Sequence, residues 1–484
     1  MGAQPGSVTS VPEDRGHRDP VRYAWLFFPA FMVFPLISMY LASVTGARLW
    51  YWLTPFALFV VVPILDALLD RHLMNVAQSA ARRIEEDPYY RWIAWLCVPL
   101  HWAPVILGAW VISTRDLDWA SWVGISLSAG IVAAFGLITA HELGHKRSRV
   151  DHWLAKFTLA AGFYGQYTID HNRGHHRDVA TPEDSGTARF GEGFWYFWLA
   201  RQIPQSTALR PWRLEKQRLA RKGKGPWSLE NEVLQPVFIS LLGYATLILL
   251  LGGAVLPFLG VVVITTYLFH GVIDYIEHYA LLRPTMKDGR YARVLPRDSW
   301  NCDDFVTTFL FMGAGRHSDH HAYPLRRYQV LQTLPDLPTL PAGYLSMFWL
   351  ALVPALWRSV MDPLVLRRVD HDLNQINVDP RQRQALFRKY SSVPDRSVSE
   401  TVARRGASGA GEVTAGTGGA TAGADHRCPG CGYTYRESAG DPSQGFAPGT
   451  PWSRIPDTWS CPDCAVRDKV DFESLPAAAK AAGD

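Results

Sequence analysis

Long runs without charged side chains alternate with polar segments through the first half of the chain. Residues 25–44, 92–113 and 119–140 contain no Lys, Arg, Asp or Glu, and each is long enough to cross a hydrocarbon layer of about 30 Å as a helix. Residues 49–65 form a shorter run, and the uncharged run 233–273 is divided by a Gly-Gly pair and a proline. The pattern predicts an all-α integral membrane domain with six transmembrane helices, at 25–44, 49–65, 92–113, 119–140, 233–251 and 257–273.

Composition alone would hide this pattern, because 48% hydrophobic and 19% charged residues would suit a soluble protein. Helices of a soluble core are the alternative interpretation. Charge placement favours the membrane, since the connections 45–48, 114–118 and 252–256 hold only Arg48 and Arg115 as basic residues. Basic segments stay on the cytoplasmic side. We therefore expect both termini and the larger polar segments to be cytoplasmic, in the inner (plasma) membrane of a bacterium.

Nine histidines cluster in the polar segments that adjoin these runs. Neutral imidazole is the commonest metal ligand and suits iron, copper and zinc. Because a catalytic zinc takes only about three protein ligands, nine imidazoles predict at least two metal ions. The isolated His101 and His270 are expected to be packed or hydrogen-bonded residues instead. The nine candidate ligands are His141, His145, His171, His175, His176, His278, His317, His320 and His321.

A small cysteine-containing domain follows a segment rich in Gly, Ala, Thr and Ser at 392–424, which is typical of a flexible linker. Two C-x-x-C pairs predict a tetrahedral site of four thiolates for zinc or iron. Disulfides are the alternative, but the cytoplasm keeps thiols reduced. The four cysteines are Cys428, Cys431, Cys461 and Cys464.

The residues between the cysteine pairs resemble rubredoxin over most of 428–472. The matching elements include Cys431-Gly-Tyr-Thr-Tyr435, Gly440-Asp441-Pro442, Pro448-Gly449-Thr450, Trp459 and Cys461-Pro-Asp-Cys464, whereas His426 and Ala465 depart from the family pattern. The resemblance implies a short antiparallel β-sheet and one iron held by four cysteines, which transfers one electron at a time. An aromatic core of Tyr435, Trp452, Trp459 and Phe472 would restrict solvent access to that iron.

The histidine segments resemble the membrane alkane monooxygenases within the histidine-box superfamily. The matches are His141-Glu-Leu-Gly-His-Lys146, Asp170-His-Asn-Arg-Gly-His-His176, Asp274-Tyr-Ile-Glu-His-Tyr-Ala-Leu281 and Arg316-His-Ser-Asp-His-His321. The resemblance covers most of 20–390. It implies two iron ions that use O2 to hydroxylate the terminal methyl of a medium- or long-chain alkane. A fatty-acyl desaturase, an aromatic-methyl hydroxylase and a membrane metal sensor are the alternatives.

The resemblance also implies partners and a domain order. Two electrons per reaction would come singly from the fused rubredoxin, itself reduced by a flavin-dependent NAD(P)H rubredoxin reductase. We expect contact with the lipid bilayer and with an alkane, and no nucleic-acid partner. The domains expected are a tail at 1–20, the membrane diiron hydroxylase domain at 21–391, the linker at 392–424, the rubredoxin domain at 425–476 and a tail at 477–484.

Five carboxylates near the histidines are candidates to orient imidazole N–H groups, although helix capping or surface pairing is an equal alternative for each. They are Glu142, Glu277, Asp170, Asp184 and Asp319. His141-Glu142-x-x-His145 alone would also fit a zinc protease with Glu142 as general base, but that leaves most of the histidines unexplained. Because an alkane dissolves in lipid, we expect an apolar channel to the metals, with Phe56, Phe59, Leu137 and Ile138 as candidate lining residues.

A basic segment at 210–224 carries seven Lys and Arg residues. The acidic residues of 425–484 exceed the basic ones by three, so the sequence predicts weak electrostatic docking of the rubredoxin domain near this segment. A position on the membrane surface or a simple solvated loop are the alternatives.

Overall fold

The computed structural model describes residues 19, 21–69, 75–286, 291–292, 294–396, 425–428, 433–456, 459, 461–462, 467 and 469–475. The predicted tails and the linker therefore lie almost wholly outside the described residues. The same is true of Cys431, Cys464 and Ala465.

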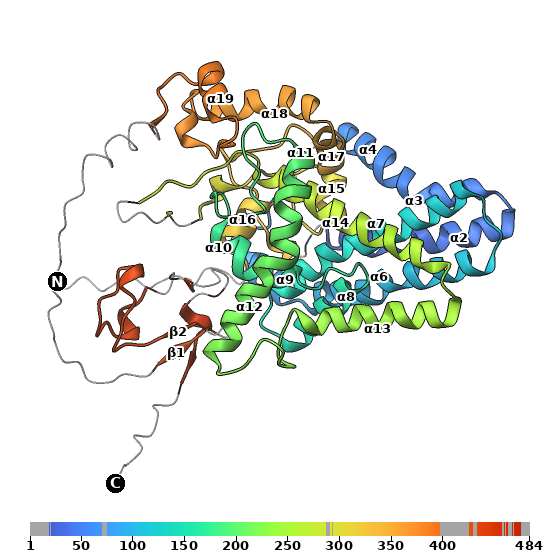
Figure 1. Ribbon diagram of the computed structural model, residues 1–484, viewed down its shortest axis with the longest axis horizontal. Helices are drawn as coiled ribbons and strands as arrows, with labels where there is room; N and C mark the ends of the chain where they lie inside the picture. The colour runs from blue at the N-terminus through green and yellow to red at the C-terminus, as the bar shows by residue number, and fades with distance from the viewer. Residues whose placement is uncertain are drawn as a thin grey trace, which may run out of the picture.

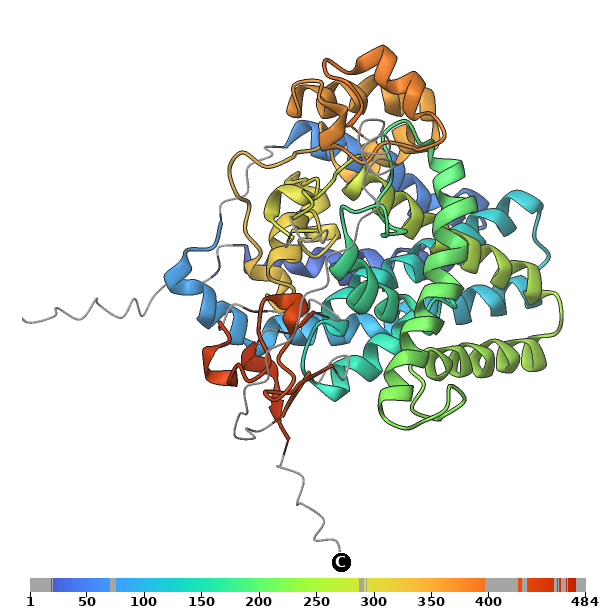
Figure 2. The ribbon, with the colours of Figure 1, turned by 60° about the vertical axis from the view of Figure 1, so that its left-hand side comes forward.

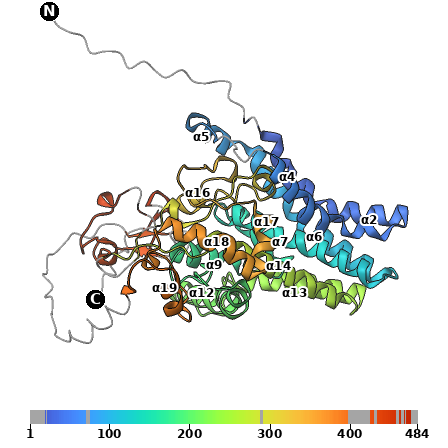
Figure 3. The same ribbon diagram turned by 90° about the horizontal axis from the view of Figure 1, so that it is seen from above.

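Long helices form an elongated bundle, and shorter helices cover one of its ends (Figure 1). The view from above shows α2, α6, α7, α13 and α14 side by side, with α9, α12 and α16 beyond them (Figure 3). The helices up to the first histidine segment are α1 Phe27–Met32, α2 Phe34–Thr45, α3 Leu53–Phe56, α4 Val62–Leu68, α5 Gln78–Glu86, α6 Pro88–Thr114 and α7 Trp119–Gly144. The remaining helices are α8 Arg149–Ala160, α9 Tyr167–Asp170, α10 His176–Asp178, α11 Phe194–Tyr196, α12 Arg210–Arg221, α13 Leu234–Leu251, α14 Val255–His278, α15 Phe305–Leu310, α16 His317–Ala322, α17 Tyr344–Leu352, α18 Pro354–Arg368 and α19 Arg383–Tyr390.

The predicted membrane spans are confirmed, with one bend. Five stretches are long and apolar enough to cross a membrane: Arg48–Leu68, Pro88–Thr114, Trp119–Gly144, Leu234–Leu251 and Val255–His278. The pair Arg22–Met32 and Phe34–Thr45 makes a sixth if it counts as one span, and it is bent by 51°. Pro35 stands in the first turn after the bend, where it has no N–H to continue the helix.

Helix α7 lies at the centre of the bundle. In the most apolar part of α7, 83% of the residues are buried inside the protein, whereas only 22% are buried in the corresponding part of α13. Small residues let its neighbours approach closely, as in other membrane bundles. A Cβ added to Gly130 would lie 2.8 Å from Thr265 of α14. The ends of α7 and α14 therefore lie close together, and both carry histidines beyond the predicted spans.

The rubredoxin domain contains a three-stranded antiparallel sheet in the order β2-β1-β3, as expected from the resemblance. Its strands are β1 His426–Arg427, β2 Thr434–Tyr435 and β3 Glu473–Ser474. The aromatic core is confirmed, since Tyr435 and Trp459 are buried and Trp452 and Phe472 pack against them. His426 stacks flat on Trp452 with ring centroids 4.2 Å apart, so this departure from the family pattern still supplies a planar ring.

Candidate metal centre

Four separate elements bring the histidines to one end of the bundle. His141 lies in the last turn of α7, and His145 directly follows that helix. His171–His175 forms a π-helical turn that continues into α10, an irregularity common at functional sites. His278 is the last residue of α14. The six-residue helix α16 carries His317, His320 and His321.

The nine histidines converge as two groups, in each of which the ligand atoms lie within 4.8 Å of one another. The structure thus brings together all nine candidate ligands and leaves His101 and His270 outside both groups. The first group consists of His141, His145, His171, His176 and His320. The second group consists of His175, His278, His317 and His321.

The geometry of both groups fits bound metal ions. The Nε2 atoms of His171 and His176 lie 3.1 Å apart, as do those of His278 and His317. Two imidazoles about 2.1 Å from one metal, at ligand angles of about 90–109°, would have nitrogens about 3.0–3.4 Å apart. Among the described residues, neither ring nitrogen of the buried His145 has a hydrogen-bond partner. Buried polar atoms normally have partners, and a metal bound to one of these nitrogens would supply a partner for it.

Burial also keeps most of these rings neutral. Desolvation, followed by the charge of neighbouring imidazoles, holds the pKa well below its ordinary value for His145, His171, His317, His320 and His321. A neutral imidazole offers a lone pair to a metal, whereas an imidazolium does not. The charge state of the site therefore suits metal binding without prior loss of protons from these rings.

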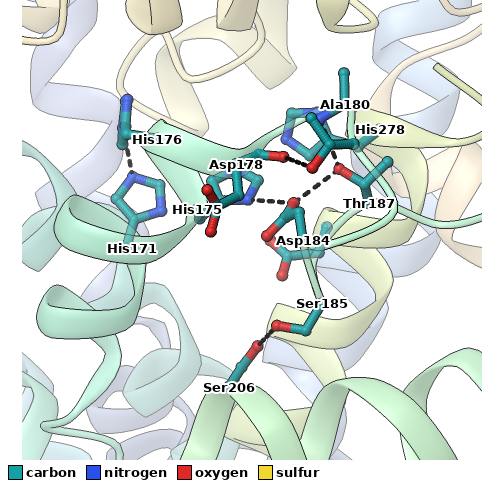
Figure 4. A network of polar contacts seen from close by, with 12 residues as sticks. His171, His175, His176, Asp178, Ala180, Asp184, Ser185, Thr187, Ser206 and His278 are labelled. Atoms are coloured by element: carbon teal, nitrogen blue, oxygen red, sulfur yellow. Dashed lines mark hydrogen bonds and ion pairs between the residues drawn. The ribbon is translucent and has the colours of Figure 1, made fainter. Parts of the chain in front are cut away.

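Asp184 orients His175 of the second group. Figure 4 shows its carboxylate facing the ring of His175 and the hydroxyl of Thr187, and the Nδ1 atom of His175 lies 2.9 Å from Oδ2 of Asp184. Burial opposes the charged imidazole, but Asp184 outweighs it and raises the pKa of His175 to about 9. A metal that binds Nε2 would displace the proton that this pKa places there, while the hydrogen bond from Nδ1–H to Asp184 stays, which is the usual arrangement behind a metal-bound histidine.

Arg210 supports this carboxylate and was not identified from the sequence. Its guanidinium donates to Asp184 at 2.9 Å and to Asp178 at 2.9 Å, and it lies 3.4 Å from Asp170. The basic segment 210–224 is thus only partly a surface feature, because Arg210 and Arg218 are buried. No signal in the sequence separates these two from the other cations of the segment.

Glu277 is the second carboxylate that touches an imidazole. Its Oε2 atom lies 3.3 Å from Nε2 of His317, and the hydroxyl of Tyr344 donates to Oε1 at 2.6 Å. The side chain is buried. Glu277 therefore reaches the convergence point of the second histidine group and is held there by Tyr344.

The other three carboxylates have cationic partners and touch no imidazole among the described contacts. Glu142 lies 3.1 Å from Lys146 and Asp170 lies near Arg210. Burial raises the pKa of Asp170 to about 6. Asp319 accepts from Arg326 and from the backbone N–H of Gln332. These contacts match the pairing alternative for all three carboxylates.

An apolar cavity runs between α7 and α14 up to both histidine groups. Its wall includes Phe135, Leu137, Ile138, Phe269 and Ile273, and its inner end includes His141, His171 and His317. Leu137 and Ile138 thus line it as expected. Phe56 does not, because it is 55% exposed on the outside of the bundle, and Phe59 packs one layer away against Phe269 and Phe348.

His270 also lines this cavity, although it belongs to neither group. Its Nδ1 atom is hydrogen-bonded to the hydroxyl of Tyr164 at 2.9 Å, and its Nε2 atom lies 3.4 Å from the carboxylate of Asp274. His101 is likewise hydrogen-bonded, to the Val132 carbonyl and to Thr139. Both residues match the expectation of hydrogen-bonded, buried histidines.

Replacing Asp184 with Asn should weaken metal retention at the second group. The amide keeps the shape but loses the charge that fixes the tautomer of His175, so we expect a loss of about 10–100-fold in activity or metal affinity. Iron content after dialysis against a chelator measures it. Asp178→Asn is the matched control, because it also loses a bond to Arg210 but contacts no imidazole. Equal losses in both variants would contradict an orienting role for Asp184.

The fold and the site define a helical membrane protein with a histidine-lined metal centre and an appended rubredoxin domain. The family model for fatty acid desaturases matches residues 117–351, and the rubredoxin model matches residues 425–472. The latter match indicates an iron-binding domain, in which Cys428 and Cys461, two of the four predicted ligands, are buried.

Curated relatives identify the family. Alkane 1-monooxygenase 1 of Alcanivorax borkumensis is 40% identical over 82% of this chain and 97% of the relative. Alkane 1-monooxygenase of Ectopseudomonas oleovorans is 40% identical over 80% of this chain and 95% of the relative. The xylene/toluene monooxygenase hydroxylase component of Pseudomonas putida is 30% identical over 51% of this chain and 64% of its own length. The chain belongs to the alkane 1-monooxygenase family.

Proposed function

We propose that this chain hydroxylates the terminal methyl group of medium- or long-chain alkanes to 1-alkanols with O2. The observation that carries the proposal is the apolar cavity between α7 and α14, which ends at His141, His171 and His317. A hydrocarbon has no polar group for a protein to bind, so shape and burial must position it. A narrow apolar cavity that ends at the metal ligands would present the chain end first.

Each histidine group would hold one iron ion, five imidazoles on the first and four on the second. Two irons bound there would supply the activation of O2, with one oxygen atom transferred to carbon, the other released as water and two electrons consumed. Asp184 would keep His175 in the ligating tautomer, and Tyr344 would keep Glu277 beside His317. Asp170 would support Arg210, whereas Glu142 and Asp319 would act only through their ion pairs with Lys146 and Arg326.

The rubredoxin domain would deliver the electrons. Cys428, Cys431, Cys461 and Cys464 would hold its single iron, which carries one electron at a time. The linker at 392–424 would keep this domain close to the hydroxylase domain, and a flavin-dependent NAD(P)H reductase would restore the reduced state. With the two irons of the histidine groups, the complete chain would contain three iron ions.

The bilayer would surround the long helices and leave both metal sites in the cytoplasm. Most exposed side chains of α13, such as Leu249 and Leu250, are apolar, as expected of a helix that faces lipid. The basic residues of the polar segments favour the cytoplasmic side of a bacterial inner membrane. A lipid-soluble substrate and water-soluble electron donors would then reach the site from different sides.

A second candidate is hydroxylation of aromatic methyl groups, which the similarity to the xylene/toluene monooxygenase component favours. A desaturase is the third, because the desaturase model matches residues 117–351. The purified chain, a rubredoxin reductase and NADH, supplied with alkanes, alkylbenzenes and fatty-acyl thioesters, would separate the three. We expect 1-alkanols to dominate the products in mass spectrometry. Alkenes or benzylic alcohols as the main products would reject the alkane proposal.

A further inference from the structure

One arginine of the rubredoxin domain reaches into the hydroxylase domain. Arg467 is only 3% exposed, and its guanidinium donates to the backbone carbonyls of His145 and Lys146, each at 3.0 Å. Figure 2 shows the rubredoxin ribbon, in red, against the end of the bundle that carries the histidine segments. The two domains therefore meet directly beside the first histidine group, and the basic segment 210–224 borders their interface, since Lys222 and Glu473 line one cavity.

The acceptors suit an arginine for a physical reason. Helix α7 ends at Gly144, so the carbonyls of His145 and Lys146 lie just past its C-terminus, where partial negative charge gathers. The ring of His152 also bonds the Lys146 carbonyl, at 2.6 Å. Arg467 supplies two N–H donors in a fixed fork together with a positive charge. It thus caps the end of α7 from another domain.

The same arginine belongs to the loop of the second cysteine pair. The N–H of Cys461 donates to the carbonyl of Arg467 at 2.7 Å, and the guanidinium of Arg467 then reaches the backbone of His145. A short chain of covalent and hydrogen bonds thus joins a predicted ligand of the rubredoxin iron to a predicted ligand of the first histidine group. The docked side of the domain is therefore the side on which Arg467 and Cys461 are joined by this hydrogen bond.

The interface around this contact is polar and incompletely closed. Arg147, 61% of whose side chain is exposed, pairs with Asp471. Beside them a cavity of about 510 Å³ is lined by Arg218 and Lys222 of the basic segment and by Glu473 of the rubredoxin domain. Small polar interfaces are typical of transient electron-transfer complexes.

We propose that Arg467 docks the rubredoxin domain on the end of α7 and that this contact is made and broken within each reaction. The proposal rests on the proposed function. Hydroxylation needs two electrons, and one rubredoxin iron, on passing from ferrous to ferric, delivers one. The domain must therefore be reduced again by the flavin of the reductase between deliveries, and the docked state buries Arg467 against the hydroxylase domain. Release exposes that side of the rubredoxin domain, while tethering keeps the local concentration high enough for weak docking.

A thiol-cleavable cross-link tests the docked state directly. Arg147→Cys and Asp471→Cys place one thiol on each side of an ion pair that joins the two domains, and a short bis-methanethiosulfonate reagent bridges the gap left by the arginine side chain, which is too wide for a direct disulfide. Mass spectrometry of the 147–471 cross-linked peptide then measures docking independently of activity. We expect the cross-link to form rapidly, and to form at least about tenfold more slowly when Arg467→Ala is added, because two charge-assisted hydrogen bonds are lost. Arg436→Ala, an exposed arginine of the same domain that pairs with Asp425, should leave the rate unchanged. No cross-link, or equal rates with and without Arg467, would overturn the docking site.

The cross-linked chain, in which the rubredoxin domain is locked in place, tests whether this domain must leave the end of α7 to be reduced. We expect reductase and NADH to bleach the ferric rubredoxin absorbance at least about tenfold more slowly in the cross-linked chain than after its reduction with a thiol, because the reductase must reach a covered face. Each single-cysteine variant serves as a control. Equal rates in the locked and released chains would overturn the make-and-break proposal. A released chain that is reduced normally but forms no alkanol would instead reject the proposed function alone.

Discussion

Replacing His145 or His321 with Ala is expected to lower alkanol formation by more than about 100-fold, since even residues that only support metal ligands are worth about 10–100-fold. Each variant should also lose one of the three irons expected per chain, because His145 belongs to the first histidine group and His321 to the second. Elemental analysis of iron, together with product quantification, measures both effects.

The matched control for these variants is His371→Asn. His371 is exposed, and within the described part of the chain its ring bonds only the Tyr390 carbonyl. Its φ of 59° is a conformation that Asn tolerates better than Ala. We expect this variant to keep three irons and full activity. If His145→Ala and His321→Ala both retained three irons, the division of the histidines into two metal-holding groups would be wrong.

Adding bulk to the cavity wall is expected to shorten the range of accepted alkanes. Ala134 lines the cavity on α7, seven residues before His141, which places it about 10 Å from that histidine along the helix. Ala134→Trp should reduce turnover of alkanes that extend past this point by at least about tenfold and spare shorter ones, because overpacking is costly in a closed apolar site. Competition between alkanes of different length measures the shift.

Leu249→Trp adds similar bulk on the outer face of α13, where Leu249 is 84% exposed. We expect its chain-length profile to match that of the unchanged protein. A uniform loss for every chain length in Ala134→Trp would indicate damage to packing, and an unchanged profile would show that the substrate takes another route.

The sequence predicted the spans and the histidine clusters well because both are local. A run such as 119–140 is recognisable without any tertiary information, and the four-residue spacing of His141 and His145 is visible in the chain. In the structure α7 runs on to Gly144 and so carries His141 in its last turn. Leu137 and Ile138, which precede His141 by about one turn of that helix, line the cavity as predicted.

Tertiary contacts decided what the sequence could not. Arg210 looks like six other cations of its segment, yet it is buried among Asp170, Asp178 and Asp184. Phe56 and Phe59 are three residues apart on one span, and only the packing shows that Phe56 faces outward. The five carboxylates were equivalent in sequence, whereas only Asp184 and Glu277 meet an imidazole. The division of nine histidines into groups of five and four depends on how four distant segments meet.

The most direct test of the central claim is the origin of the product's oxygen. The purified chain with reductase, NADH and a linear alkane under ¹⁸O2 should form a 1-alkanol that carries one ¹⁸O atom, with label absent when ¹⁸O is supplied only as water. The product should disappear in His145→Ala and His321→Ala. A 1-alkanol with oxygen from water, or an alkene without oxygen, would contradict the assignment of this site as an oxygen-inserting hydroxylase.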